Sequence, residues 1–232
     1  MPPTPSRGLG ASAAPADGDT RQRLLHAAGE EFARVGFRAA NVRDICRDAG
    51  ANVAAVKYHF GSKEELYRKV WEHAAIEMVT AEPMPTLGPD DDPAEVLRVF
   101  IGWFLRLVLT EDIDHPCAGG MLAHETVEPT GGLDVFVEHV AGPIHAELRR
   151  IVGAVLGKPG ARKLTDDLTN AVVALCVNPK HSHAILDRLG HRPPSDRAAI
   201  DRMARRLSDF ALHGLLGVAR DEHKTDASGS DR

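Results

Sequence analysis

The chain has 232 residues, of which 43% are hydrophobic and 26% charged, and its formal net charge is −5 at pH 7. This length and composition are ordinary for a folded protein of one large domain or two small ones, and they exclude a disordered chain. Because no apolar run of about 18 residues and no N-terminal apolar run of about seven occur, we expect no membrane span, no secretory signal and a cytoplasmic protein.

The charge is unevenly distributed along the chain. Residues 20–71 hold ten Lys and Arg against six Asp and Glu, a balance of +4, whereas the remainder has a balance of −9. A polyanion meets one face of a protein and not its average charge, so only the first segment suits a nucleic acid.

Helical periodicity runs through almost the whole chain, and no segment shows the alternation of a half-buried strand. We therefore expect an all-α fold. Residues 1–19 are rich in Pro, Gly, Ala and Ser, and residues 221–232 are polar throughout. Both ends are predicted to be disordered tails.

The first helix is expected to begin at Thr20, a favourable N-cap, and to end at Gly36. Its apolar face consists of residues three and four positions apart, Leu25, Ala28, Phe32 and Val35.

Two short helices joined by a glycine-containing turn follow. Asn41 should cap the first, Gly50 should end it in a conformation with positive φ, and Asn52 should cap the second. The residues expected to face the core are Val42, Ile45, Cys46, Ala49, Val53, Val56 and Phe60. The spacing indicates a helix-turn-helix, whose second helix enters the major groove of DNA. From spacing alone, an ordinary pair of core helices stays an alternative.

A fourth helix is predicted to open with a capping box of Ser62 and Glu65 and to bury Leu66, Val70 and Trp71. Residues 81–93 contain four prolines and a run of aspartates, so they are predicted to be a linker between two helical units.

The second unit should contain further apolar helices. The first should run from Pro93 to about Thr110, and after a loop a short helix should end at Pro129. A longer helix should follow Thr130 and be kinked at Pro143. The last two are expected near residues 161–187 and 196–219, with Ser195 as the cap of the second.

The last predicted helix has an apolar side formed by Ile200, Met203, Leu207, Phe210 and Leu215. This helix and the apolar helix before it, taken from each of two chains, would form a four-helix dimer interface. Such an interface fits the apolar side better than a membrane surface does.

Three stretches within residues 20–77 resemble the N-terminal domain of TetR-family transcriptional regulators. They are TRQRLLHAAGEEFARVGF, NVRDICRDAGAN and, above all, YHFGSKEEL. The resemblance implies an all-helical homodimer with a DNA-binding domain at 20–77, and a ligand-binding and dimerisation domain at 94–220. It also implies a repressor that a small-molecule effector releases from a palindromic operator in double-stranded DNA.

We predict that the DNA-contacting residues are Thr20, Asn41, Arg43, Asn52, Ala54, Ala55, Lys57, Tyr58, His59 and Lys63. Asn41 stands where the family usually has Thr, and Asn52 where it often has Ser. Lys57 replaces a more usual aromatic residue, which leaves the operator preference open.

Residues 124–148, HETVEPTGGLDVFVEHVAGPIHAEL, are similar to effector domains of the CecR branch of that family. The candidate effector-binding residues are Trp103, Phe104, His124, Glu125 and His139, which combine apolar walls with a few polar groups. Taken singly, each is as readily explained as a core or solvated side chain.

Other kinds of site find little support in the sequence. Cys46, Cys117 and Cys176 form no C-x-x-C pair and are expected to be reduced thiols. The groups Cys176, His181, His183 and His115, Cys117, His124 lack convincing metal-ligand spacing. We therefore expect no metal, no cofactor and no enzymatic activity. Two alternatives remain: an enzyme that uses His124 and Glu125, and a DNA-binding protein whose second domain only dimerises.

Overall fold

The computed structural model describes residues 17–114, 116–157, 162–192, 194 and 196–229. Every regular element in these ranges is a helix, so the all-α prediction is confirmed. The helices are α1 (Asp17–Ala39), α2 (Val42–Asp48), α3 (Val53–Phe60), α4 (Lys63–Ala81), α5 (Pro93–Asp114), α6 (Pro116–Val127), α7 (Gly131–Phe136), the π turn η1 (Val137–Ala141), α8 (Gly142–Leu156), α9 (Arg162–His181), α10 (His183–Arg188) and α11 (Arg197–Gly229). In the described part of the chain, none of these helices is long and apolar enough to cross a membrane.

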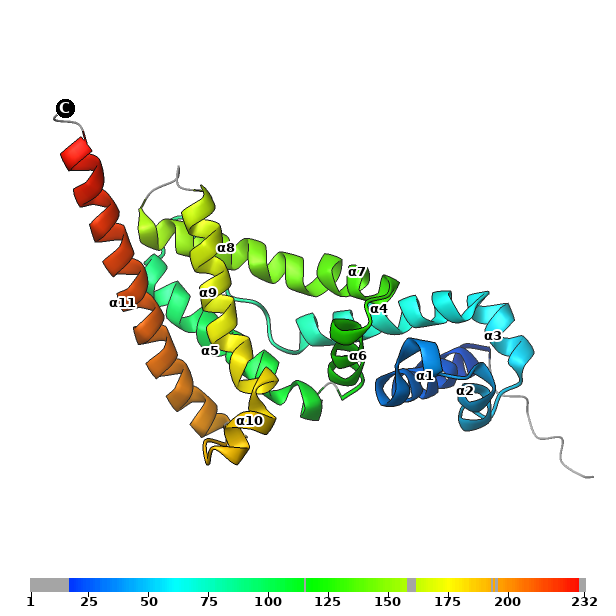
Figure 1. Ribbon diagram of the computed structural model, residues 1–232. Coiled ribbons are helices and arrows are strands. Elements are labelled where there is room, and N and C mark those ends of the chain that lie inside the picture. Colours follow the sequence, from blue (N-terminus) through cyan, green and yellow to red (C-terminus); the bar gives the residue numbers. More distant parts are fainter. Residues whose placement is uncertain (1–16, 115, 158–161, 193, 195, 230–232) are drawn as a thin grey trace, which may run out of the picture.

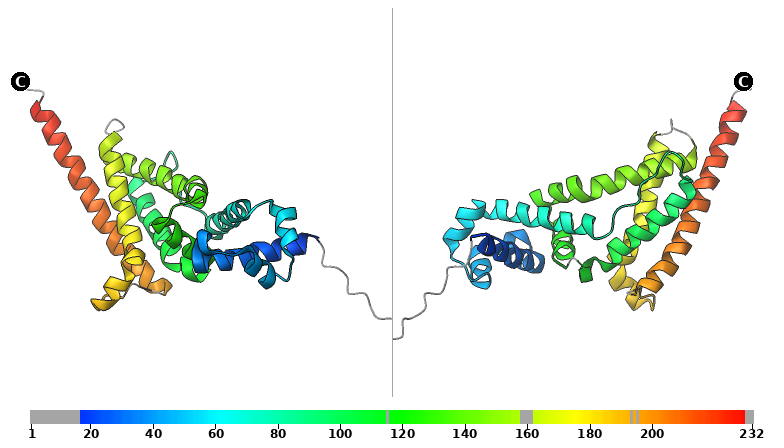
Figure 2. Two further views of the ribbon diagram at one scale, coloured as in Figure 1. Left: turned by 45° about the vertical axis from the view of Figure 1, so that its right-hand side comes forward. Right: turned by 180° about the vertical axis from the view of Figure 1, so that it is seen from behind.

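The helices form an elongated molecule with two ends. Helices α1, α2 and α3 lie at one end, and α11 lies at the opposite end (Figures 1 and 2). Helix α4 runs from the first group toward the middle, where α6 contacts both α1 and α5. A change in the middle of the molecule can therefore reach the first group through α4 and α6.

The start of α1 differs from the prediction. The helix begins at Asp17, so Thr20 lies in its first turn, where its hydroxyl accepts a hydrogen bond from Arg23 Nη2 at 3.3 Å. Acidic residues at a helix N-terminus are favourable, which allows the helix to start ahead of Thr20. The expected break at Gly36 is confirmed, because its φ of 77° is not helical. Residues 1–16 of the predicted N-terminal tail lie outside the described residues.

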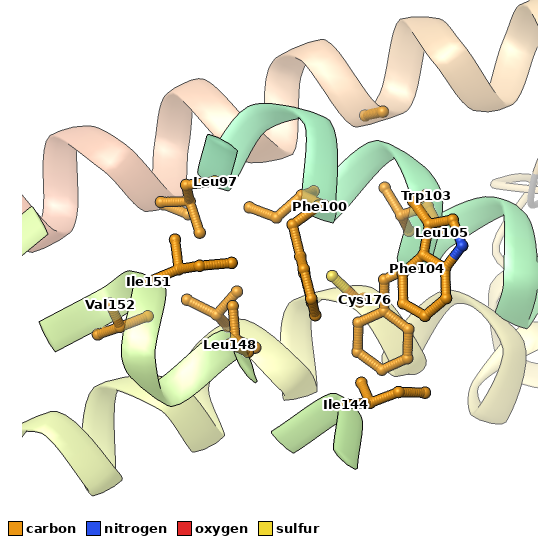
Figure 3. Close-up of a cluster of buried hydrophobic side chains, with 14 of the residues drawn as sticks. Leu97, Phe100, Trp103, Phe104, Leu105, Ile144, Leu148, Ile151, Val152 and Cys176 are labelled. Carbon is orange, nitrogen blue, oxygen red and sulfur yellow. The ribbon is translucent and has the colours of Figure 1, made fainter. Parts of the chain in front are cut away.

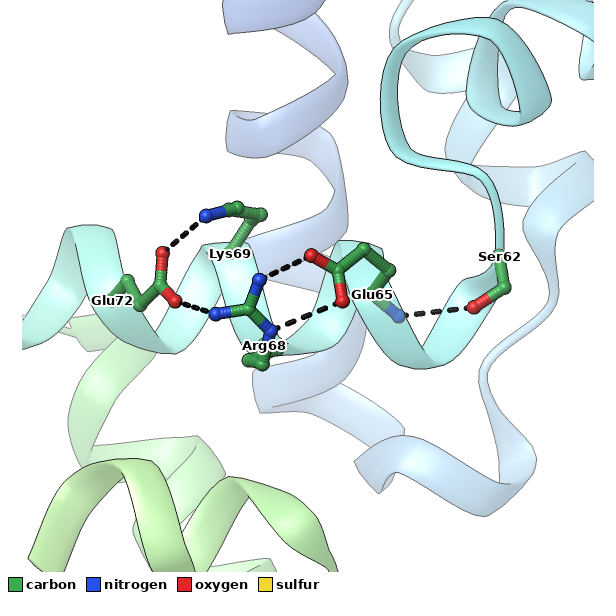
Figure 4. Close-up of polar contacts among 5 residues, drawn as sticks. All are labelled: Ser62, Glu65, Arg68, Lys69 and Glu72. Atoms are coloured by element: carbon green, nitrogen blue, oxygen red, sulfur yellow. Dashed lines mark hydrogen bonds and ion pairs between the residues drawn. The ribbon is translucent and has the colours of Figure 1, made fainter. Parts of the chain in front are cut away.

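Helix α4 opens at the predicted cap. Ser62 Oγ accepts a hydrogen bond from Glu65 N at 3.1 Å, but the Glu65 carboxylate binds Arg68 and does not complete a capping box. Arg68 and Lys69 also pair with Glu72, so the exposed side of α4 is covered by ion pairs (Figure 4). The other side of the helix buries Leu66 and Trp71, as predicted.

Three boundaries in the second half differ from the prediction. The expected loop after Thr110 is helical, because α5 continues to Asp114 and α6 begins at Pro116, which suits a first helical position. Ser195 lies outside the described residues, and Asp196 Oδ1 accepts the bond from Ala199 N at the start of α11. The predicted tail from residue 221 is helical to Gly229, because extending an existing helix needs no new nucleus.

Pro143 interrupts the regular α-helical hydrogen bonding because it has no N–H to donate. The predicted kink takes the form of the π turn η1, in which Gly142 N donates to Val137 O. The wider turn gives room for the Pro143 ring, which would collide with the preceding turn of a regular α-helix.

The linker is held against the second unit. Trp103 Nε1 donates to Glu82 O at 3.0 Å, and Leu87 N donates to Glu147 Oε1 at 2.8 Å. Arg106 binds the Glu82 carboxylate at 2.6 Å and lowers the pKa of Glu82. Residues 82–92 therefore connect α4 to α5 and are bonded to the helices of the second unit.

Two hydrophobic cores are present, and their border does not follow the linker. The first contains residues of α1–α4 and also Met121 of α6 and Val135 of α7. The second is built mainly from α5, α8, α9 and α11, with Phe100 and Leu148 at its centre (Figure 3). Helices α6 and α7 thus belong in part to the N-terminal core, although the linker separates them from it in the sequence.

Candidate functional site

The turn between α2 and α3 is fixed by local bonds that the sequence predicted. Asn41 Oδ1 accepts from Arg43 N, and Asn52 Oδ1 accepts from Ala55 N, both at 2.9 Å. Gly50 has a φ of 61°, and Ala51 N donates to Cys46 O at 2.8 Å. Arg23 of α1 adds a bond from its Nε to Ala49 O at 2.9 Å, so α1 holds the turn in place.

Helix α3 exposes the face that the sequence assigns to DNA. Asn52, Ala54, Lys57 and Tyr58 are exposed, and the Tyr58 side chain is 76% accessible. Ala55 and His59 are half-buried, and the His59 ring lies 4.9 Å from that of Tyr58. The inward face consists of Val56 and Phe60 as expected.

Val53 is a correction to that pattern, because half of its surface is exposed rather than buried. It occupies the first position of α3, before the helix has turned toward the core. An apolar side chain is therefore added to the exposed face, where it can contact thymine methyl groups.

The remaining predicted DNA residues lie around α3. Arg43 is exposed on α2, whereas Thr20 is half-buried in the first turn of α1. Lys63 packs over the Phe37 ring at 4.7 Å and donates to Arg38 O at 3.4 Å, so it ties α4 to the end of α1. Arg21, which is not among the predicted DNA-contacting residues, lies over the ring of Phe60, the last residue of α3, at 5.3 Å.

A second feature is an apolar cavity of about 460 Å³ in the second unit. Its lining residues come from α4 through α9. They are Met78, Phe104, Leu107, Val108, Gly119, Leu122, Ala123, Thr126, Leu133, Phe136, Val137, Val140, Ala141, Ile144, His145, Val173, Val177, Lys180 and His181. The volume is within the range of roughly 300–1,000 Å³ that holds small-molecule ligands.

Of the five predicted effector residues, Phe104 alone lines this cavity. Trp103 is turned toward the linker and bonded to Glu82 O, and His139 is exposed on η1. His124 lies against Gly36 of α1, where a Cβ on the glycine would be 3.0 Å from the imidazole Nδ1. Successive positions on a helix point in directions about 100° apart, so Trp103 can face the linker while Phe104 faces the cavity.

Glu125 is buried at a junction between the two units. Its carboxylate accepts from Tyr67 Oη of α4 and from Thr130 N, both at 2.6 Å, and from Leu133 N at 3.2 Å. Burial, and after it the bond to Glu125, raise the pKa of Tyr67, so the hydroxyl stays protonated and donates. One side chain of α6 thus holds α4 and the start of α7 together.

Helix α6 also packs closely against α1. A Cβ on Gly120 would be 2.8 Å from Ala33 Cβ and 2.9 Å from Ala33 O, and Gly29 faces Cys117 in the same way. Because the opposite side of α6 lines the cavity with Leu122, Ala123 and Thr126, this helix lies between the cavity and α1.

Three ionisable residues that line the cavity are absent from the predicted effector residues: His145, Lys180 and His181. In the structure α9 continues through Pro179 to His181. The signal was the spacing of Val173, Val177, Lys180 and His181, which places all four on one face of a helix.

The cysteines and histidines do not form a reactive or metal-binding group in the described residues. Cys46 and Cys176 are buried, and burial raises the pKa of the Cys176 thiol to about 12. Cys117 is half-buried, and its pKa is raised by burial, Glu30 and Glu77. A raised pKa removes the thiolate on which cysteine chemistry depends. His115 lies outside the described residues.

Two family descriptions match successive parts of the chain. Residues 24–70 match bacterial regulatory proteins of the tetR family, and residues 93–215 match the C-terminal domain of the HTH-type transcriptional dual regulator CecR. The first range contains the helix-turn-helix, and the second contains all the lining residues of the cavity except Met78.

The chain is also similar to named HTH-type transcriptional regulators. The HTH-type transcriptional repressor NicS of Pseudomonas putida is 34% identical over 84% of this chain and 92% of its own length. CecR of Shigella flexneri is 29% identical over 59% of this chain and 65% of its own length, slightly less than two thirds.

Solved structures share the fold at low sequence identity. HlyIIR, a hemolysin II transcriptional regulator, superposes with a TM-score of 0.54 at 20% identity, over 83% of this chain and 99% of its own. PfmR of Thermus thermophilus gives 0.55 at 21% identity, over 83% and 95% of the two chains.

Proposed function

The chain belongs to the TetR family of bacterial transcriptional regulators, and on this premise we propose that it is a homodimeric repressor released from its operator by a small-molecule effector. The observation that carries the proposal is the position of α6, which lines the cavity on one side and contacts α1 on the other. A ligand that moves α6 therefore also moves the helix that holds the α2–α3 turn.

The cavity favours this function over the two alternatives. A second domain that only dimerises needs no cavity of this size. An enzyme would need His124 and Glu125 at a substrate site, but neither lines this cavity. The Glu125 carboxylate already accepts hydrogen bonds from Tyr67 Oη, from Thr130 N and Oγ1, and from Leu133 N.

The mechanism requires differential binding. To change the dimer from almost fully competent for DNA to almost fully incompetent, the effector must prefer the second state by ~5.5 kcal/mol, on the order of 10⁴-fold. The expected change is a shift of α6 and α4 that alters the separation of the two α3 helices, which must match one turn of DNA.

The first test is selection of bound sequences from a random DNA duplex pool at two salt concentrations. We expect an enriched palindrome whose affinity falls as salt rises, because phosphate contacts release counterions. A folded, dimeric protein that enriches no sequence would refute the proposed operator binding.

Lys57→Ala tests the α3 face directly. If Lys57 contacts a base, we expect the binding free energy for the operator to weaken by about 1–3 kcal/mol. If it contacts a phosphate, we expect weaker binding together with a salt dependence whose slope is smaller by about one. Titration of labelled operator over a salt series measures both. Lys163→Ala, which removes an exposed lysine from α9, is the control and should leave both values unchanged. If Lys57→Ala leaves both operator affinity and salt slope unchanged, Lys57 does not contact the DNA.

The dimer is proposed to form along α11. Two of the five residues predicted for this seam, Ile200 and Leu215, are instead buried in the core of the same chain. Met203, Leu207 and Phe210 continue to Gly214 and Gly217 with alternate spacings of four and three residues, which places them on one side of the helix. Phe210 is 68% exposed in the single chain, and a Cβ on either glycine would have no atom within 4 Å. Met203 and Leu207 pack partly against the core of their own chain, so the part of α11 that is open to a second chain lies around Phe210, Gly214 and Gly217.

Phe210→Asp should convert the dimer to a monomer, because it places a charge in the apolar seam. Sedimentation velocity measures the change, and operator affinity should fall with it. Val127→Asp makes the same chemical change at an exposed apolar residue at the end of α6, so it should remain dimeric. A Phe210→Asp protein that sediments as a dimer would exclude α11 as the seam.

A further inference from the structure

The exposed face of α3 is apolar in its first turn. Val53 and Ala54 occupy the first two positions of the helix, and both are exposed, Val53 over 50% of its surface. In helix-turn-helix proteins the N-terminal residues of the second helix contact the edges of the bases. The part of α3 that is placed to reach the bases therefore carries two apolar side chains.

The polar residue that precedes this turn is already used by the helix. Asn52 Oδ1 accepts the cap bond from Ala55 N at 2.9 Å. An asparagine that recognises adenine uses both its amide oxygen and its amide nitrogen in hydrogen bonds to the base. Because the oxygen is directed at the backbone of α3, we do not expect Asn52 to form that pair. The exposed hydrogen-bonding side chains of α3 begin one turn later, at Lys57 and Tyr58.

An apolar side chain recognises a particular group in the major groove. Donors and acceptors distinguish the base pairs there, and the apolar group among them is the C5 methyl of thymine. Val53 branches at Cβ and has one strongly preferred χ1 rotamer in a helix, so its methyl groups point in fixed directions. Ala54 beside it has no side-chain atom beyond Cβ, which lets the helix approach the groove closely. We propose that Val53 is a specificity-determining residue that recognises a thymine methyl group in each operator half-site.

This inference rests on the proposed function, because it concerns the operator, and it is tested with the full-length protein and the duplex that the selection yields. Each thymine of a half-site is replaced in turn by deoxyuridine, which removes only the 5-methyl group. Burial of one methyl group corresponds to about 4-fold in affinity, so one replaced half-site should weaken binding about 4-fold and two about 16-fold. 5-Bromodeoxyuridine at the same position should restore the affinity, since bromine is close to a methyl group in size.

Val53→Ala assigns the contact to its residue. The variant should lose most of the preference for thymine over deoxyuridine, because the side chain that meets the methyl group is shortened. Val99→Ala is the matched control, since it makes the same substitution at a valine of α5 that is 56% exposed, and it should keep the full preference. Thermal unfolding of both variants confirms that they are folded.

The outcomes separate this inference from the proposed function. An operator whose half-sites lack thymine, or tolerate deoxyuridine at every thymine, overturns the inference while operator binding stands. A preference that is unchanged in Val53→Ala also overturns it, because the methyl group then acts through another residue or through the shape of the DNA. A folded, dimeric protein that enriches no sequence refutes operator binding, and the inference fails with it.

Discussion

Replacing Glu125 with alanine is expected to lower the free energy of unfolding by about 3–5 kcal/mol. The substitution leaves Tyr67 Oη, Thr130 N and Leu133 N without their common acceptor. Each buried group that loses its partner costs about 1–3 kcal/mol, and these costs are only partly additive. Urea unfolding at a fixed protein concentration measures the change.

The matched control for this change is Glu128→Ala. Glu128 lies three residues further on, and its carboxylate pairs with Arg38 at 3.5 Å while both side chains are mostly exposed. An exposed ion pair of this kind contributes about 0–1 kcal/mol. Tyr67→Phe should give an intermediate loss, because Glu125 then keeps its two backbone donors. Equal effects of Glu125→Ala and Glu128→Ala would show that the junction contributes nothing special to stability.

Tyr67→Phe also tests the path from the cavity to DNA. If the Tyr67–Glu125 bond transmits movement of α6 to α4, the ratio of operator affinities without and with effector should shrink in this variant. Binding of the operator alone should change less. A ratio equal to that of the unmodified protein would place the path elsewhere, with the α1–α6 contact as the remaining route.

The second large effect is expected at Gly132, where alanine should destabilise the protein by about 1–3 kcal/mol through overpacking. A Cβ there would lie 2.4 Å from Trp71 Nε1 and 2.5 Å from Tyr67 Cε1. Both rings are buried in the N-terminal core, so they have little room to move. Thermal and urea unfolding measure the loss.

Gly131→Ala provides the control in the adjacent position. A Cβ on Gly131 has no atom within 4 Å, and both glycines lie at the start of α7. The gain in helix propensity without a clash should leave stability unchanged or slightly higher. Similar losses in the two variants would show that the close contact with Trp71 and Tyr67 is not what requires glycine.

The helix-turn-helix was predictable because its signals are local. Caps at Asn41 and Asn52 and a positive φ at Gly50 each depend on a few neighbouring residues, and all three are confirmed. The error at Val53 is also local, since helical spacing does not show whether the first residue of a helix has reached the core.

The cavity was less predictable because it depends on which faces of seven elements, α4 to α9 with η1, meet. Phe104 was selected correctly as a lining residue, whereas Trp103, one position earlier, is bonded to the linker. Glu125 was predicted to contact an effector, but its carboxylate accepts a hydrogen bond from Tyr67, 58 positions away in the sequence. A single sequence contains no signal for such a pair, so a buried carboxylate with a structural role resembled a ligand contact.

The π turn at 137–141 has a consequence for how chain length varies among related proteins. A π turn amounts to one extra residue inserted in an α-helix. A relative that lacks one residue there, and also lacks a proline at the position of Pro143, would keep α7 and α8 in place with a regular helix between them. A deletion elsewhere in α8 would instead rotate the following side chains by ~100° and turn Leu148 and Ile151 away from the core. An alignment gap at this turn would therefore indicate a reshaped cavity wall, formed here by Val137, Val140 and Ala141, rather than a shorter helix.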